Sequence, residues 1–425
     1  MKCAAVLMGL LTVGACMGAD IAVPPVPVHK EIALDASTLE NYVGHYKASD
    51  GIFAIMLKDG QLQAQFTDQS GFPIYASAKD KFFYKVVDAQ IDFERDAKGK
   101  VIGLVEHQDG TDDRAPRLDG LPGYRLFEVE PGRRMNLDCT GSGSPTVLLE
   151  SGQGGATSSW DLLQPLLAAH TQVCSYDRAG LGFSDPARRP STSANIVDDL
   201  HRLLAAASIK PPYVLVGHSS GGVHVRLYAA TWPSEVVGMV LVDPSSEYQY
   251  ESARKRDPAH PTPEQWHAKL AEGFKWALKH QCIAADEAST LAVGSELYKK
   301  CVDAGLDFGI LPAAILSAQL SEDETFEESQ NQLASAKRSL GDMPLIVLTE
   351  GVRPPSKKPL SPEKEAARVA SDEHWIALNK DIAALSTRGV QHVIPGVGHY
   401  IQNEQPQTVA DAVLQVIRQA SADPH

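Results

Sequence analysis

A serine between glycines is the first candidate for chemistry: residues 217–221 read Gly-His-Ser-Ser-Gly. An apolar run, residues 213–216, precedes this motif, and a helix-like stretch, residues 222–232, follows it. A strand, a sharp turn and a helix around Gly-x-Ser-x-Gly predict a nucleophile elbow, which holds its serine in a strained conformation at the end of a sheet. Small residues must flank that serine because the strand and helix backbones approach closely. We therefore predict Ser219 as a nucleophile; the alternative is an inert serine in a glycine-rich loop.

A serine hydroxyl is a poor nucleophile unless a base lies within hydrogen-bond reach and a third group orients that base. His399 is the best candidate among the fourteen histidines. It lies in a glycine-flanked loop, after the predicted strand of residues 391–394 and before the helix-like run of residues 405–419. His392 is the second choice, but in mid-strand we expect it to be packed.

Six segments occur in an order that resembles the α/β-hydrolase superfamily, from about residue 125 to 420. They are the elbow, the strand and glycine-rich loop of 146–155, the turn segment 174–185, the apolar runs 236–242 and 345–348, and the histidine loop 396–399. The elements from Pro145 onward alternate strand and helix, which favours a mostly parallel sheet. The resemblance implies flanking helices and a helical cap, at about residues 246–340.

The resemblance also implies where the remaining catalytic groups lie. The acid of the triad commonly follows the strand of residues 345–348, where Glu350 is the nearby carboxylate, but some branches place it one strand earlier, where Asp243 stands. We predict Asp243, with Glu350 as runner-up and Asp372 or Glu373 as further alternatives. A strand-end aspartate can also simply cap a turn.

The oxyanion of an acyl-transfer intermediate needs two backbone N–H donors. The resemblance assigns them to Ser220, directly after the nucleophile, and to Gln153 in the glycine-rich loop, residues 151–155. A flexible loop without this role is the alternative. Arg178 could hold this loop or meet a substrate, and we favour the structural role.

The first part of the chain has a different character. Residues 37–118 contain five short strand patterns with turn signals between them, which predict a small antiparallel β domain or barrel. The segment loosely resembles the small β domain appended to β-lactamase-like serine hydrolases. All candidate catalytic groups follow residue 150, so we expect this domain to be dispensable for chemistry and residues 120–425 to form the hydrolase domain.

The chain begins with a pattern typical of export. Residues 1–19 read as a signal peptide, and residues 13–16 resemble a lipoprotein cleavage box with Cys16 as the lipidated residue. Residues 20–36 include a proline-rich stretch that predicts an extended tether. We expect a lipid-anchored protein of the cell envelope or, alternatively, a periplasmic or secreted one, with the lipid as its only membrane contact.

Four cysteines remain after the signal and the lipidation site, and an even number can pair in an oxidising compartment. We predict the pair Cys282 with Cys301, which lie in one helical region. The resemblance implies that Cys139 and Cys174 lie on neighbouring strands of the hydrolase sheet and can form a second pair; four buried thiols in a reducing cytoplasm are the alternative. No Cys-x-x-Cys or Cys/His cluster suggests a metal site, and we expect no cofactor. The formal net charge of −14 makes nucleic acid an unsuitable partner.

The sequence thus predicts a serine hydrolase that cleaves an ester, thioester or amide of a small molecule through an acyl-enzyme. Serine at position 219 argues against dehalogenase and epoxide hydrolase chemistry, which uses a carboxylate nucleophile. A proline-iminopeptidase-like peptidase is one alternative, and a non-catalytic surface binding protein on a hydrolase scaffold is another. The substrate and the oligomeric state stay open.

Overall fold

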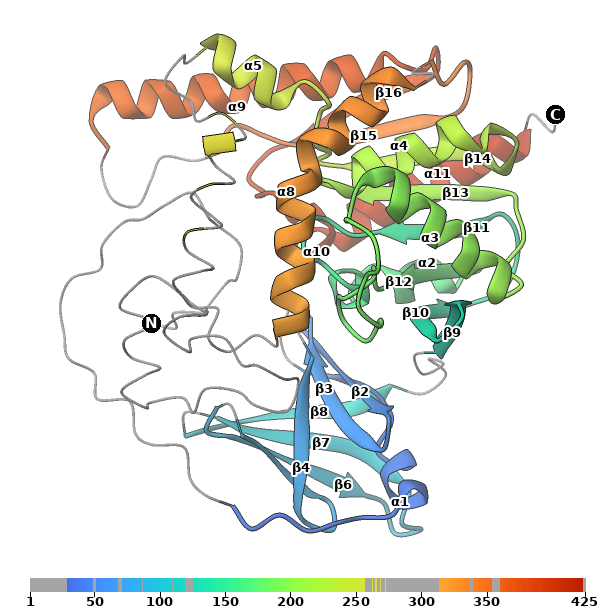
Figure 1. Cartoon of the computed structure of the whole chain (residues 1–425), viewed down its shortest axis with the longest axis vertical. Helices are drawn as coiled ribbons and strands as arrows, with labels where there is room; N and C mark the ends of the chain where they lie inside the picture. The colour runs from blue at the N-terminus through green and yellow to red at the C-terminus, as the bar shows by residue number, and fades with distance from the viewer. Residues whose placement is uncertain are drawn as a thin grey trace.

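The computed structural model contains a β-barrel followed by an α/β unit (Figure 1). Apart from a few isolated positions between 262 and 272, the described residues are 29–48, 51–67, 71–85, 87–108, 110–118, 125–256, 313–336, 339–353 and 360–422. The signal segment, residues 20–28 of the tether, Cys16, Cys282 and Cys301 lie outside these ranges, so the predictions made for them stay predictions. The described end of the tether lies against the barrel: the N–H of Ile32 donates to the carbonyl of Ala76 over 2.8 Å, and Glu31 pairs with Lys85 at 2.8 Å.

The barrel is antiparallel and closed, because its eighth strand pairs with its first. Its strands are β1 (Gly44–Lys47), β2 (Ile52–Lys58), β3 (Gln61–Phe66), β4 (Phe72–Ala78), β5 (Lys81–Tyr84), β6 (Ala89–Arg95), β7 (Val101–Gln108) and β8 (Thr111–Leu118). A short helix, α1 (Ala36–Glu40), precedes them and begins at the side-chain cap of Asp35. Aromatic rings such as Tyr42, Phe82 and Phe93 fill the interior, which is therefore a packed core.

The predicted small antiparallel β domain is confirmed, but it has eight strands, whereas the sequence showed five strand patterns. One of the turn signals in the sequence is Gly-Phe-Pro at residues 71–73, yet Phe72 and Pro73 begin strand β4 and pair with Ala64 and Gln63. Proline is tolerated at the start of a strand, where a missing N–H breaks little of the ladder. Strand β8 has no apolar alternation in its sequence, because most of its residues are polar and at least partly exposed.

The second unit is built on an eight-stranded sheet in the order β16-β15-β14-β13-β11-β12-β10-β9. Its strands are β9 (Arg125–Glu130), β10 (Arg133–Thr140), β11 (Thr146–Glu150), β12 (Val173–Tyr176), β13 (Tyr213–His218), β14 (Val236–Val242), β15 (Leu345–Glu350) and β16 (Gly389–Ile394). The six strands from β11 onward pair in parallel, and β10 and β9 add an antiparallel edge. Strands β11 to β15 are nearly continuous apolar runs because both faces are covered.

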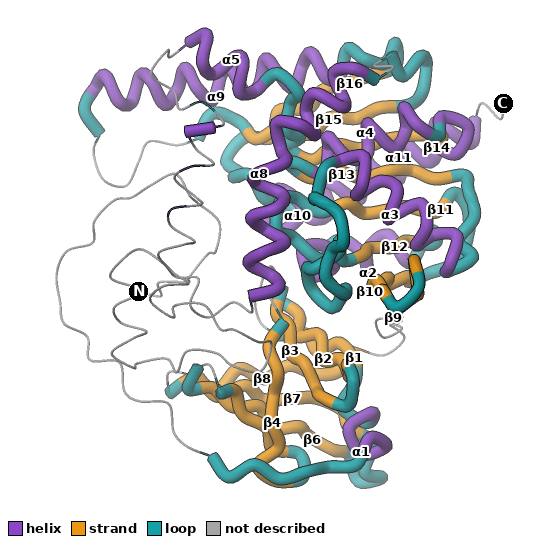
Figure 2. Tube along the Cα trace, viewed as in Figure 1, coloured by secondary structure: helices purple, strands orange, loops and turns teal. Residues whose placement is uncertain are grey.

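Helices cover both faces of the sheet (Figure 2). One core contains side chains of α3 (Ser193–Ala206), α4 (Gly221–Thr231) and α9 (Pro362–Ala383). The opposite core contains side chains of η1 (Thr157–Trp160) and α11 (Pro406–Ala422), and α2 (Gln164–Ala168) packs there as well. Short segments η2 (Pro233–Glu235) and α10 (Ile401–Glu404) complete the unit. This is the predicted α/β-hydrolase fold.

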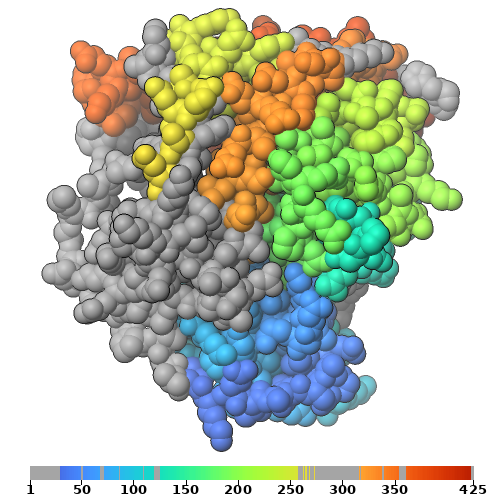
Figure 3. Space-filling model, viewed as in Figure 1, coloured from blue at the N-terminus to red at the C-terminus, as the bar shows by residue number. Residues whose placement is uncertain are grey.

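The segment between β14 and β15 breaks the alternation of strand and helix, as the sequence predicted for a cap. Its described helices are α5 (Gln249–Arg256) and the long α8 (Ala313–Ser335), and the helix-like patterns at 263–279 and 286–302 lie almost entirely outside the described residues. The surface of α8, orange in Figure 3, borders the green surface of the earlier part of the sheet domain. Hydrogen bonds from Ser191 N to Ser321 Oγ (3.0 Å) and from Ser193 N to Ser329 Oγ (2.8 Å) fasten it there.

The barrel contacts the α/β unit directly. Phe72 of β4 packs against a small apolar cluster of Leu181, Ile315 and Ala318, of which the last two lie on α8. Thr67 Oγ1 also donates to Asp161 Oδ2 over 3.1 Å. Barrel and cap therefore share an interface.

A disulfide joins Cys139 to Cys174, which face each other across the antiparallel strands β10 and β12. This is the pairing that the positions of the two residues on neighbouring strands predicted. Among the described helices, none is both long enough and apolar enough to cross a membrane.

Candidate active site

Ser219 stands at a sharp turn between strand β13 and helix α4, with a positive φ of 52°. A positive φ is unfavourable for a residue with a Cβ, so the surroundings must hold it. Its N–H donates to the carbonyl of Val242 (3.1 Å), and its own carbonyl accepts from Ser245 N (2.9 Å). The elbow is therefore tied to the end of β14, directly beside Asp243.

The glycines of the motif have a steric role. A Cβ added to Gly217 would lie 2.7 Å from the carbonyl oxygen of Gly221, and one added to Gly221 would lie 2.4 Å from that of Glu150. Neither distance is tolerable between such atoms, and in both cases the obstacle is backbone. The close approach of strand and helix that the motif predicted is thus present.

His399 and Asp243 are in direct contact. His399 Nδ1 lies 2.6 Å from Asp243 Oδ2, although 156 residues separate them in the sequence. Burial lowers the pKa of His399, but the hydrogen bond and the charge of Asp243 outweigh burial and raise this pKa above its ordinary value of 6.5. An imidazole held in this way by a carboxylate can accept a proton at its other nitrogen.

Asp243 is fully buried at the end of β14 and is itself held by two donors. Its Oδ1 accepts from Trp375 Nε1 (2.8 Å) and from the backbone N–H of Glu350 (2.9 Å). These bonds occupy one carboxylate oxygen and leave the other for His399. The indole of Trp375 is a site residue that sequence reasoning missed, because a single tryptophan in a largely polar helix gives no signal of a partner 132 positions away.

The carboxylate hydrogen-bonded to the ring of His399 is that of Asp243, and the alternative residues for the base and the acid have other surroundings. Burial and the charge of Asp243 raise the pKa of Glu350 to about 7, while its backbone, as described above, serves Asp243. Asp372 is buried in ion pairs with Arg353 (2.5 Å) and Arg368 (2.9 Å), and Glu373 is exposed. His392, expected to be packed, is exposed because β16 is the edge strand of the sheet.

His218 links the elbow to the histidine loop. Its Nε2–H donates to the backbone carbonyl of His399 over 3.0 Å, and the two rings lie 4.7 Å apart between centroids. Burial holds the pKa of His218 well below its ordinary value, so this ring is neutral. This bond connects the elbow to the loop that carries His399.

The glycine-rich loop after β11 lies against the serine. A Cβ added to Gly152 would come within 3.2 Å of Ser219 Cβ and 2.9 Å of His218 Nδ1, so only glycine fits there. Gln153 follows, and Ser220 is the N-cap residue of α4, where helix N–H groups have no intrahelical partner. Both predicted donors thus belong to backbone segments that adjoin Ser219. Among the described residues, no group of three or more metal-ligating side chains gathers.

Comparisons with known proteins agree with this architecture. The sequence pattern of the alpha/beta hydrolase family matches residues 147–412, and a pattern described as a domain of unknown function, DUF3471, matches residues 28–115. The uncharacterized protein YqjL of Bacillus subtilis is 26% identical over 276 residues, which is 65% of this chain and 85% of YqjL.

Two further matches differ in how much of the chain they cover. A protein of Gibberella zeae named as an AB hydrolase superfamily protein is 33% identical over 111 residues, 25% of this chain and 34% of that protein. The solved structure of the epoxide hydrolase CorEH has a TM-score of 0.45 and 18% identity, covering 70% of this chain and 98% of that one. With the family pattern spanning well over half of its length, the chain belongs to the alpha/beta hydrolase family and is a hydrolase of that superfamily.

Proposed function

We propose that this protein is a serine hydrolase that cleaves a carboxylic ester of a small molecule through an acyl-enzyme. The observation that carries the proposal is the contact of Asp243 with His399 at the same end of the sheet as the strained Ser219. A serine at this position supports acyl transfer and not the carboxylate-nucleophile reactions of other members of the fold. An ester is the substrate class we favour because its hydrolysis is the easiest acyl transfer.

The proposed first step is acylation of Ser219. As Ser219 Oγ attacks the ester carbonyl carbon, its proton passes to His399 Nε2 and the carbonyl π electrons move onto oxygen. The N–H groups of Gln153 and Ser220 stabilise the oxyanion formed. The intermediate then collapses, the C–O bond to the alcohol breaks, and the alcohol leaves with the proton of His399.

The proposed second step is deacylation. His399 takes a proton from a water molecule, whose oxygen attacks the acyl carbon. The second tetrahedral intermediate then collapses: its bond to Ser219 Oγ breaks, His399 returns the proton to that oxygen, and the carboxylic acid leaves. Asp243 stabilises the imidazolium formed in each step.

A fluorophosphonate probe tests the proposal, because it phosphonylates a serine only where a base and an oxyanion site activate it. We expect labelling of the purified protein and hydrolysis of p-nitrophenyl esters, with a preference along a series of acyl chain lengths. A folded protein that neither labels nor hydrolyses any member of the series would instead be a binding protein on a hydrolase scaffold.

A further inference from the structure

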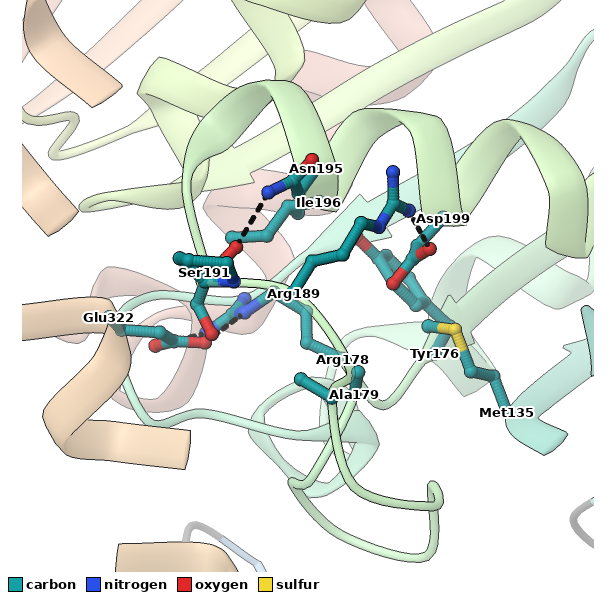
Figure 4. Close-up of a pocket in the computed structure, with 12 residues that line it drawn as sticks. Met135, Tyr176, Arg178, Ala179, Arg189, Ser191, Asn195, Ile196, Asp199 and Glu322 are labelled. Carbon is teal, nitrogen blue, oxygen red and sulfur yellow. Dashed lines mark hydrogen bonds and ion pairs between the residues drawn. The ribbon is translucent and has the colours of Figure 1, made fainter. Parts of the chain in front are cut away.

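Arg178 follows strand β12 and is almost completely buried, with 3% of its surface exposed. Its guanidinium donates to two carboxylates, Glu150 Oε1 (2.7 Å) and Glu322 (2.6 Å to Oε1 and 3.0 Å to Oε2). It also donates to two carbonyl oxygens of the glycine-rich loop, those of Ser151 (2.8 Å) and Gly152 (2.6 Å). Figure 4 shows Arg178 and Glu322 facing each other beside a small pocket. Because Arg178 is so deeply buried, we expect it to affect the site through the glycine-rich loop to which it donates.

The bond to Gly152 fixes a specific peptide plane. In a trans peptide the C=O and the following N–H point in opposite directions within one plane. Arg178 Nη2 holds the carbonyl of Gly152, so it also sets the direction of the N–H of Gln153. That N–H is the proposed oxyanion donor, and Gly152 is the residue that lies against Ser219.

Helix α8 of the cap holds the same loop from the other side. Glu322 Oε2 accepts from the backbone N–H of Gly154 over 2.8 Å, and Asp323 accepts from the side chain of Gln153. Gly154 has a φ of 67°, and a Cβ there would lie 3.0 Å from Gln319 Nε2 on the same helix. Glu322 is thus the one described side chain that bonds both to Arg178 and to the loop backbone.

We propose that Arg178 and Glu322 are positioning residues for the oxyanion hole, and that helix α8 completes the hole by holding the Gly152–Gln153 peptide. The inference rests on the proposed function, since it concerns the donor of that reaction. Neither side chain touches the substrate. The cap therefore does more than cover the site: the docked position of α8 sets the alignment of one oxyanion donor.

The test compares the full-length protein with its Glu322→Gln and Arg178→Lys variants. Glu322→Gln keeps the shape of the side chain and leaves Arg178 paired with Glu150, so one carboxylate still balances the buried guanidinium. The readouts are kcat and KM for a p-nitrophenyl ester and the inhibition constant of an alkylboronic acid. The boronic acid forms a tetrahedral adduct with the serine, and its oxygen occupies the oxyanion position.

Misalignment of an oxyanion donor reduces the stabilisation of the transition state more than that of the bound substrate. Removing an oxyanion donor altogether costs about 10²–10³ in kcat, so we expect misalignment to lower kcat by roughly 10- to 100-fold. The boronic acid should lose affinity by a similar factor, while KM changes less than about threefold. A purely structural role would instead lower the thermal midpoint and leave boronate affinity unchanged.

Asp199→Asn is the matched control. Asp199 also faces a buried arginine, Arg133, with contacts of 2.7 and 3.0 Å. It lines the same small pocket as Arg178 and Glu322, but its hydrogen bonds go to Arg133 and Arg189 and not to the glycine-rich loop. We expect Asp199→Asn to lower stability without changing boronate affinity.

Asp323→Ala is a second test of α8, at a less buried position. For this variant we expect a decrease of roughly two- to tenfold in kcat and in boronate affinity.

The outcomes separate this inference from the proposed function. If the wild type neither labels nor turns over ester, the proposed function fails. If the wild type is active but folded Glu322→Gln keeps its kcat and boronate affinity, the positioning role is wrong. If Glu322→Gln does not fold, Asp323→Ala decides: unchanged kcat and boronate affinity there would likewise overturn the role of α8.

Discussion

At the scale of single residues, Asp243 determines which nitrogen of His399 carries a proton. Its Oδ1 is occupied by Trp375 and by the N–H of Glu350, so Oδ2 is left for Nδ1. In Asp243→Asn the amide oxygen would keep the first two bonds and the NH₂ group would face Nδ1. The ring must then carry its proton on Nε2, where it cannot act as a base.

We therefore expect Asp243→Asn to lower kcat by about 10³–10⁴-fold. Glu350→Gln should cost less than about tenfold, because its backbone N–H remains and its carboxylate is not bonded to the ring. Steady-state kinetics on one ester measure both variants. The reverse ranking would move the role of acid to Glu350.

The pH dependence follows from the same contact. Catalysis needs neutral His399, whose pKa Asp243 raises above 6.5, so kcat/KM should fall as the pH drops through that raised value. In Asp243→Asn the main group that raises the pKa of His399 is gone, so burial, which lowers this pKa, is opposed only by the smaller effect of the charge of Glu350. The acidic limb of the residual activity should then lie at lower pH than in the wild type. A limb at unchanged pH would show that another group controls it.

Trp375 offers a second residue-scale test. Trp375→Phe keeps an aromatic ring but removes the N–H donor to Asp243. A hydrogen bond to a charged group contributes about 1.5–3 kcal/mol, so we expect kcat to fall by roughly tenfold or more. Trp232→Phe is the control, because Trp232 stacks on His201 at the end of α4, outside the site. Equal kcat in both variants would show that the indole does not support the acid.

At the scale of elements, the sequence predicts those helices, strands and turns whose pattern lies within one short segment. The elbow at Ser219 combines a strand, a turn and a helix within one short segment, and the structure has all three. Contacts between distant elements carry no such signal. Nothing near Trp375 indicates Asp243, and nothing near Glu322 indicates Gly154. Strand β4 was missed for a different reason, since Pro73 favoured a turn locally and the closure of the barrel decided otherwise.

At the same scale, we predict that the disulfide between β10 and β12 stabilises the fold. It closes a segment with a separation of 35 residues, so its loss should destabilise the protein by about 3–4 kcal/mol through the entropy of the unfolded chain. Replacing both Cys139 and Cys174 by serine should lower the thermal midpoint while kcat at 25 °C stays within about twofold. Reduction of the wild type by dithiothreitol is the matched comparison. An unchanged midpoint in both would show that this pair does not stabilise the sheet edge.

At the scale of the whole molecule, the barrel meets the cap. The sequence alone predicts a barrel that is dispensable for chemistry, whereas Phe72 packs against Ile315 and Ala318 of the helix that holds the glycine-rich loop. We expect Phe72→Ala to lower the thermal midpoint, because it removes apolar contact at this interface. If α8 aligns the loop, kcat should also fall by about two- to fivefold.

Tyr75→Ala is the control for this prediction. Tyr75 lies on the same strand but contacts Phe83 and Lys85 of the barrel itself. This variant should weaken the barrel and leave kcat unchanged. If Phe72→Ala behaves in the same way as Tyr75→Ala, the barrel is an appendage, as the sequence predicted.

The central claim is that Ser219 is an activated nucleophile, and covalent labelling tests it most directly. The full-length protein is treated with a fluorophosphonate, digested, and analysed by mass spectrometry beside its Ser219→Ala variant. The account predicts one phosphonyl group on Ser219 in the wild type, and neither labelling nor ester hydrolysis in the folded variant. Labelling at another serine, or ester hydrolysis by Ser219→Ala within tenfold of the wild type, would contradict it.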